Sequence, residues 1–170
     1  MTRVLSDATG YQRNYRAYPY GSYDQLDNTD LLFPLAPDET RPSKERVLGI
    51  RTGPSSGRGY PFGELAARGV TVALNETVGG EPIAVLYSAG DGETAVAYRS
   101  TVQGQTLTFE VDGDSWRDLE TGTTWDLAGA TVGGPLSPAR LEPVAQAQAY
   151  VVFWFAWRHF QPASEIWFAN

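Results

Sequence analysis

The chain of 170 residues is 42% hydrophobic and 12% aromatic, which indicates one folded domain and excludes a disordered chain. The formal net charge of −7 argues against nucleic acid as a partner, because phosphate binding needs a basic surface. The absence of cysteine excludes disulfides and thiolate metal sites, and the single histidine, His159, excludes a multi-histidine centre. We therefore expect no cofactor and no metal site.

The first 40 residues differ from the rest, so we expect a leader segment at residues 1–40 and a domain at residues 41–170. Within thirteen residues, and without helical or alternating spacing, the leader carries Tyr11, Tyr15, Tyr18, Tyr20 and Tyr23. Such rings commonly bury a face on the core. The alternative is an exposed platform that stacks on sugar or base rings.

Short apolar runs separated by glycine and proline predict a strand-rich body. The run Ile83–Tyr87 is almost continuously apolar and predicts a central strand. Pro61–Gly69 has proline at its start and glycine at its end, which predicts one or two helical turns. Gln103-Gly104 predicts a hairpin turn. Further strands are expected at Val47–Ile50, Val70–Asn75, Thr94–Val102 and Gln105–Val111.

The end of the chain has a different pattern. Gln146–Phe160 contains no glycine or proline, and its apolar residues fall at helical spacing, which predicts a helix. A closing strand is expected at Glu165–Phe168. The predicted fold class is α+β: a mainly antiparallel curved sheet or partial barrel with one C-terminal helix packed on it. No apolar run approaches the roughly twenty residues of a membrane span.

The stretch Trp116–Asp126 is the densest in polar and aromatic chemistry. A calcium loop is excluded, because Arg117 replaces the obligatory glycine and Thr123 replaces the terminal glutamate. Asp118 and Glu120 lie two residues apart and suit an acid/base pair. Carboxylates near Arg117 and Arg99 more often form surface ion pairs, and we expect that arrangement. We also expect a tight turn at residues 121–123 and a buried Trp125.

Other polar and aromatic residues suit structural or ligand-binding roles. Asn75 ends a predicted strand and suits a backbone-capping role. His159, next to apolar neighbours, suits a half-buried structural role. A mixed polar and aromatic ligand pocket would include Arg46, Tyr60, Asn75, Tyr87, Arg99, Asp118, Glu120, Thr121, Thr124, Trp125 and His159.

Several motifs occur in an order that resembles a known family. They are Lys44-Glu45-Arg46-Val47, Gly59-Tyr60-Pro61-Phe62, Asn75-Glu76-Thr77-Val78-Gly79-Gly80, Asp118-Leu119-Glu120-Thr121-Gly122-Thr123-Thr124-Trp125 and Phe153-Trp154-Phe155-Ala156-Trp157. In this order they resemble the DUF3179 family, a domain of unknown function, over essentially the whole chain.

The resemblance implies a repeated unit. Longer members look like two copies, of which the first carries Cys-Pro-x-Cys-Gly where this chain has Tyr87-Ser88-Ala89-Gly90-Asp91. This chain resembles the second, cysteine-free copy. Its Thr2–Leu5 segment resembles the strand expected after the C-terminal helix. The resemblance also implies export, and therefore an extracytoplasmic location.

We predict a non-catalytic binding or assembly module that uses the tyrosine-rich leader and the Trp125 region as contact surface. Its partner would be a second copy of the chain or a second DUF3179-like unit. The alternative is an enzyme, or a small-molecule or metal carrier, with a polar pocket around Asp118, Glu120 and His159. This alternative requires that the three side chains share one concave site.

Overall fold

The computed structural model describes residues 10, 11, 14, 17–32, 38–90, 92–145 and 148–169. Thr2–Leu5 and Tyr15 lie outside the described residues. In chain order the elements are β1 (Arg46–Arg51), β2 (Gly57–Pro61), α1 (Phe62–Arg68), β3 (Thr71–Val78), β4 (Glu81–Ser88), β5 (Thr94–Arg99), β6 (Thr101–Val102), β7 (Gln105–Thr106), β8 (Phe109–Asp112), β9 (Ser115–Asp118), β10 (Thr124–Trp125), β11 (Thr131–Gly133), β12 (Ala149–Phe153), α2 (Trp154–Phe160) and β13 (Glu165–Ile166).

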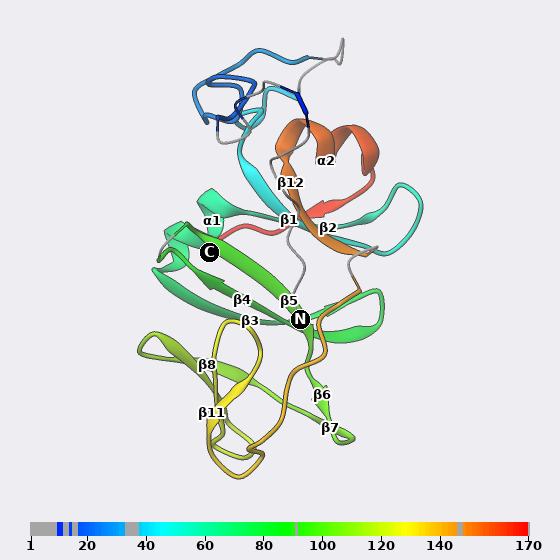
Figure 1. Ribbon diagram of the computed structural model, residues 1–170. Helices are drawn as coiled ribbons and strands as arrows, with labels where there is room; N and C mark the ends of the chain where they lie inside the picture. The colour runs from blue at the N-terminus through cyan, green and yellow to red at the C-terminus, as the bar shows by residue number, and fades with distance from the viewer. Residues whose placement is uncertain are drawn as a thin grey trace.

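The elements stack in layers (Figure 1). Helix α2 lies at one end, on a sheet with the order β12-β1-β2-β13. A second sheet, β3-β4-β5, forms the middle, and a third, β11-β10-β9-β8, lies at the opposite end. Pairing is antiparallel except between β13 and β2. This is the predicted α+β class, with mainly antiparallel sheets that do not close.

Strand β4 is the centre of this stack. Ile83, Val85 and Tyr87 point toward the first sheet, while Ala84 and Leu86 point toward the third. All five are buried, because successive side chains of a strand face opposite sides and both sides are covered here. The central strand predicted from the apolar run is therefore confirmed.

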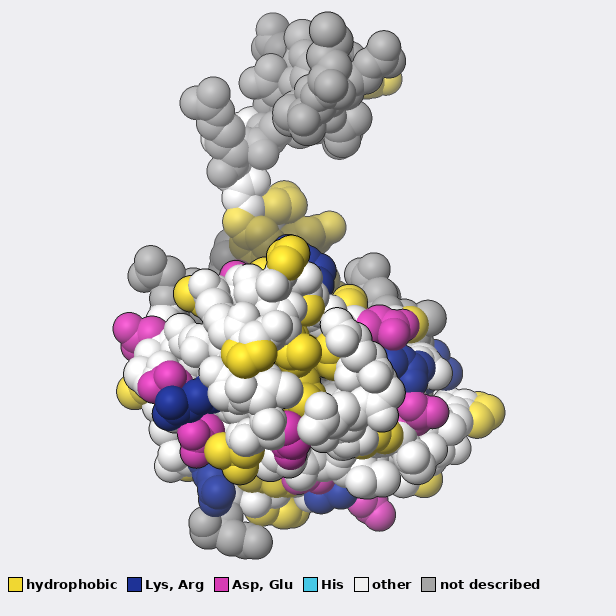
Figure 2. All heavy atoms as spheres, turned by 90° about the horizontal axis from the view of Figure 1, so that it is seen from below, with side chains coloured by type: hydrophobic (Ala, Val, Ile, Leu, Met, Phe, Trp, Pro, Cys, Tyr) yellow, Lys and Arg dark blue, Asp and Glu magenta, His cyan; other side chains and the backbone are white. Residues whose placement is uncertain are grey.

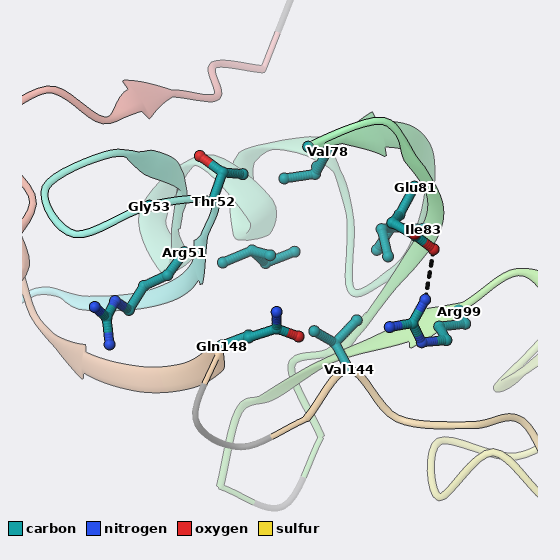
Figure 3. Close-up of a pocket in the computed structure, with 11 residues that line it drawn as sticks. Arg51, Thr52, Gly53, Val78, Glu81, Ile83, Arg99, Val144 and Gln148 are labelled. Atoms are coloured by element: carbon teal, nitrogen blue, oxygen red, sulfur yellow. Dashed lines mark hydrogen bonds and ion pairs between the residues drawn. The ribbon is translucent and has the colours of Figure 1, made fainter.

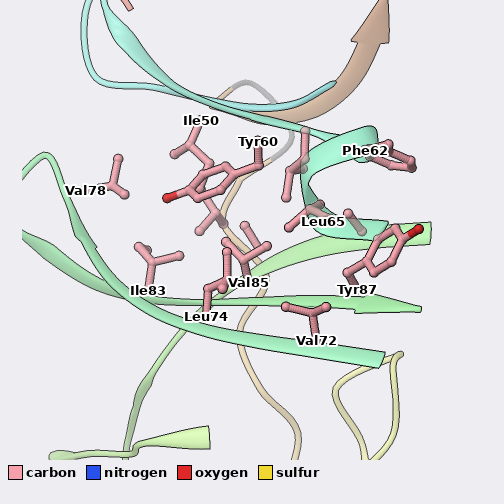
Figure 4. Packing of buried hydrophobic residues seen from close by; sticks show 14 residues of the cluster. Ile50, Tyr60, Phe62, Leu65, Val72, Leu74, Val78, Ile83, Val85 and Tyr87 are labelled. Atoms are coloured by element: carbon pink, nitrogen blue, oxygen red, sulfur yellow. The ribbon is translucent and has the colours of Figure 1, made fainter. Parts of the chain in front are cut away.

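The first core lies between the first and second sheets (Figure 4). Ile50 and Tyr60 come from β1 and β2, and Leu65 from α1 closes one side. Val72 and Val85 meet them from the middle sheet.

The short helix was predicted from Pro61–Gly69, and its position explains its apolar face: Phe62 and Leu65 are its buried residues.

Helix α2 packs on the outer face of the first sheet through Trp157. Gly49 and Gly59 are cross-strand partners in β1 and β2, and the indole of Trp157 lies against both. A Cβ atom on Gly49 would stand 2.1 Å from a Trp157 ring carbon. Glycine is therefore required at this position by the close approach of the ring.

The second core joins the middle sheet to the third. Trp116 and Trp125 are both fully buried in it, and the indole nitrogen of Trp116 donates to the Val72 carbonyl at 2.8 Å. The side-chain amide of Asn75 holds the backbone of Phe109 in β8, accepting at 2.8 Å and donating at 2.9 Å. Figure 2 views this end of the molecule, where a small central group of apolar side chains is surrounded by charged ones.

The two largest differences from the predicted boundaries concern the C-terminal helix and β3. Residues 149–153, expected to be helical, form strand β12 instead, because they pair with Arg46–Ile50 of β1. That run contains Tyr150, Val151 and Val152, which suit a strand, so long-range pairing overrides the helical spacing. Strand β3 continues past Asn75 to Val78, since its ladder with β4 runs to the Gly79-Gly80 turn. In the described part of the chain, neither helix is long and apolar enough to cross a membrane.

Candidate binding site

Lys44, the only lysine in the sequence, fixes the described leader to the body. Its amine donates to the carbonyl oxygens of Tyr23 at 2.7 Å and Asp30 at 2.8 Å. The same nitrogen lies 3.4 Å from the centroid of the Tyr23 ring, a cation–π contact. Lys44 is only 2% exposed, so the ammonium is enclosed by these leader groups and the body.

Five apolar side chains of the described leader are exposed to solvent. Tyr18 and Tyr20 are 50% and 61% exposed and contact each other edge to face, with ring centroids 5.6 Å apart. Leu26 and Leu32 are each 60% exposed, and Tyr11 is also largely exposed. The expectation that the leader tyrosines bury a ring face on the core is therefore wrong for Tyr11, Tyr18 and Tyr20.

A pocket of about 520 Å³ lies between the leader and the body. Residues 24–26 of the leader form one side, and the opposite side includes Arg46 of β1, Phe62 of α1 and Glu93 of the β4–β5 loop. The Arg46 guanidinium lies 4.7 Å from the Phe62 ring centroid. The pocket thus combines an aromatic surface with a charged pair.

Glu93 connects two of the predicted site residues. Its carboxylate accepts from Arg46 and, at 3.1 Å, from the Tyr87 hydroxyl. Arg46 also donates to the backbone carbonyl of Glu93 at 3.1 Å. Burial, followed by the hydrogen bond to Glu93, raises the pKa of Tyr87 to about 12, so its hydroxyl stays protonated. Arg46 and Tyr87 therefore belong to one network at this pocket.

Asp118 organises a second, separate cluster at β9 and β10. Its side chain is fully buried and accepts from the backbone and the hydroxyl of Thr121 at 2.6 and 2.7 Å. It also accepts from the Trp125 indole nitrogen at 2.9 Å. Thr123 is buried, and its hydroxyl bonds to that of Thr121 and accepts from the Leu136 amide. The buried Trp125 is confirmed; the tight turn is present but begins earlier than predicted, since the Gly122 amide donates to the Asp118 carbonyl.

The ion pairs expected for this stretch do not form among the described residues. Arg117 pairs with Glu110 and Arg99 with Glu81, while Asp118 is enclosed by neutral donors. The reason is burial, since Asp118 lies beneath its own turn, out of reach of either arginine. Glu120 points outward and accepts from the Thr108 amide at 2.7 Å. Desolvation raises the pKa of Glu120, but the hydrogen bonds from Thr108 outweigh this effect, so the pKa is lowered overall.

The remaining predicted site residues are dispersed. Tyr60 is buried in the first core, Asn75 binds the β8 backbone, and Thr124 is half-buried on β10. Arg99 lines a different cavity, at the end of β1. His159 is exposed on α2 beside Phe160, so the half-buried position expected for it is wrong.

The three residues of the proposed polar pocket are not brought together. Asp118 and Glu120 lie in the third sheet and the turn that follows β9, whereas His159 lies on α2 at the opposite end of the stack (Figure 1). Within the described ranges, no cluster of three or more histidine, aspartate or glutamate side chains is placed to hold a metal ion.

Sequence reasoning missed Lys44 and Glu93 as site residues. Lys44 carried a usable signal, because it is the only lysine among thirteen basic residues. Glu93 carried none: it stands in a loop with a left-handed backbone, φ 33°, and its partners come from two different strands.

Comparison with known proteins gives one match. A family model described as "Protein of unknown function (DUF3179)" matches residues 1–164, which include the leader and nearly all of the body. No curated protein and no solved structure matches the chain significantly. The chain therefore belongs to the DUF3179 family.

Proposed function

We propose that the chain is a non-catalytic assembly module whose leader contacts a second copy of the chain or another DUF3179 unit. One observation carries this proposal: Lys44 holds the leader in place while Tyr18, Tyr20, Leu26 and Leu32 stay exposed. Contact residues that are already fixed lose less entropy on binding. Tyrosine is also enriched at protein interfaces, where its ring packs and its hydroxyl finds a partner.

The family membership supports the choice of partner. The matched region begins at residue 1, so the leader is part of the unit that the family shares. A surface that lies within the shared unit is placed to serve contacts between copies. An extracytoplasmic location is part of the same proposal and rests on the family resemblance.

The Asp118 cluster supports a non-catalytic role. The Asp118 carboxylate accepts from the Trp125 indole and from both the backbone and the hydroxyl of Thr121. These contacts use the Asp118 side chain to hold the turn. The enzyme or carrier alternative requires Asp118, Glu120 and His159 in one site, and these side chains come from opposite ends of the stack. We therefore propose that the Trp125 region serves mainly as an anchor for the third sheet.

Sedimentation velocity across a range of protein concentrations tests the proposal. We expect wild-type protein to associate and the double variant Tyr18→Ser/Tyr20→Ser to sediment as a monomer. Val132→Ser is the matched control, because Val132 is 65% exposed on β11, at the other end of the stack. Association that persists in the leader variant, or is lost in the Val132 variant, would contradict the proposal.

A further inference from the structure

A cavity of about 460 Å³ opens at one end of the first core, away from the leader. It is formed by the end of β1, the β3–β4 turn, the end of β5 and the segment leading to β12 (Figure 3). Its volume lies in the range of small-molecule sites. Four buried apolar side chains form its floor: Ile50, Val78, Ile83 and Val144.

Among the described residues, the charged side chains that line this cavity are paired or directed away from it. Arg99 is bound to Glu81, and its Nε also lies 3.8 Å from Glu142. The guanidinium of Arg51 points away from the cavity in Figure 3. A charged ligand would have to displace an existing ion pair, so the rim favours an uncharged ligand.

Two hydrogen-bond donors, one on the cavity wall and one in the core beside its floor, have no partner among the described residues. The Gln148 side-chain amide lies at the cavity wall, with its nitrogen facing the cavity and its oxygen directed toward Val144 (Figure 3). The Tyr60 hydroxyl is fully buried and unpartnered, and it points between Ile50 and Val78, which belong to the floor (Figure 4). Buried polar groups are nearly always hydrogen-bonded, so an unpaired hydroxyl here requires an explanation.

We infer that this cavity binds a small uncharged molecule with an apolar body and a carbonyl oxygen. The apolar body lies on Ile50, Val78 and Ile83, and the carbonyl accepts from the Gln148 amide. The Tyr60 hydroxyl, which points between Ile50 and Val78, is assigned as a second donor to this ligand. The inference does not depend on the leader, so leader variants and cavity variants report on separate surfaces.

Prodan, an uncharged naphthalene ketone whose emission shifts to shorter wavelength in apolar surroundings, is a suitable probe. We expect saturable binding to the wild-type protein, with such a shift. Tyr60→Phe removes only the unpartnered hydroxyl and should fold normally, and Gln148→Ala changes an exposed side chain. Each variant should weaken binding about fivefold, the typical effect of one hydrogen bond.

Thr52→Trp tests the location, because Thr52 is an exposed residue on the rim and a large ring there closes the mouth. We expect it to abolish binding. Thr101→Trp adds the same ring on an exposed residue of β6 and should bind as the wild type does. Absence of saturable wild-type binding, or full binding by the Thr52 variant, would overturn the site. Unchanged affinity in both donor variants would overturn the carbonyl assignment.

Discussion

Asp118 and Lys44 are charged residues with almost no exposure, and each fixes a segment without regular secondary structure. Asp118 binds donors within seven residues of itself, and one of them is the indole of the fully buried Trp125. Lys44 binds carbonyls 14 and 21 residues away, in a leader that has no buried hydrophobic residue of its own among those described. The first charge therefore supports the core, and the second positions a surface.

The largest effect is expected for Asp118→Ala. This change leaves the Trp125 indole and the Thr121 amide without their acceptor in a buried site, which should lower the free energy of unfolding by about 3 kcal/mol. Urea denaturation followed by tryptophan fluorescence measures it. Asp114→Ala, an exposed aspartate in the β8–β9 turn, should cost less than about 0.5 kcal/mol. Equal stability of the two variants would show that the Asp118 cluster is not structural.

Gly49→Ala tests the packing of the body without changing a charge. The added methyl group collides with Trp157, so we expect a loss of about 2 kcal/mol in the free energy of unfolding. Gly133→Ala is the matched control, since no atom lies within 4 Å of a Cβ built there. A Gly49 variant as stable as the Gly133 variant would mean that α2 is not held by this contact.

Lys44→Met should act on the leader alone. Methionine keeps the apolar stem but loses both carbonyl contacts, so the amides of Tyr23, Gln25 and Asn28 should exchange their hydrogens about tenfold faster. Hydrogen exchange measured by mass spectrometry reports this, together with unchanged exchange in β4. Arg117→Met removes an exposed cation and serves as the control. Faster exchange throughout the body would assign Lys44 to the core instead.

The smallest effect concerns Asp38, which lies near the end of the leader and accepts from Arg158 of α2 at 2.9 Å. Desolvation raises the pKa of Asp38, but the hydrogen bonds from Thr40 and Arg158 outweigh this effect and lower the pKa to about 2. The folded pKa is thus below the unfolded value near 3.9, so the stabilisation is complete above about pH 4 and is lost as pH falls through about 2.

The Asp38→Asn variant measures this contribution. Because the pair is partly exposed, we expect it to be at most about 1 kcal/mol less stable than the wild type at pH 5. The difference should shrink as pH falls toward 2 in urea denaturation. A difference that grows on acidification would contradict the assigned direction of the pKa.

Local patterns predicted the elements whose contacts are local or whose burial is complete. The apolar run of β4, the Gln103-Gly104 hairpin and the proline-to-glycine limits of α1 all correspond to observed elements. Strand β12 could not be found in this way, because its formation depends on pairing with β1, about a hundred residues earlier. Helical spacing alone cannot report such pairing.

The same distinction between local and long-range contacts applies to the candidate site. The Asp118–Thr121 contact spans three residues, so the turn and the burial of Trp125 were predictable from the motif. The single lysine marks Lys44 as unusual, but its partners were not predictable, because they are backbone carbonyls, which every residue supplies. The grouping of Arg46 with Tyr87 depends on Glu93, in a loop without a motif.

Native mass spectrometry of the protein purified from its own source tests most directly whether the leader is an assembly surface. We expect complexes heavier than a single chain, containing a second copy or another DUF3179 protein, that dissociate in the Tyr18→Ser/Tyr20→Ser variant. A wild-type protein found only as a single chain of 18.6 kDa would contradict it. So would complexes that survive the loss of both tyrosines.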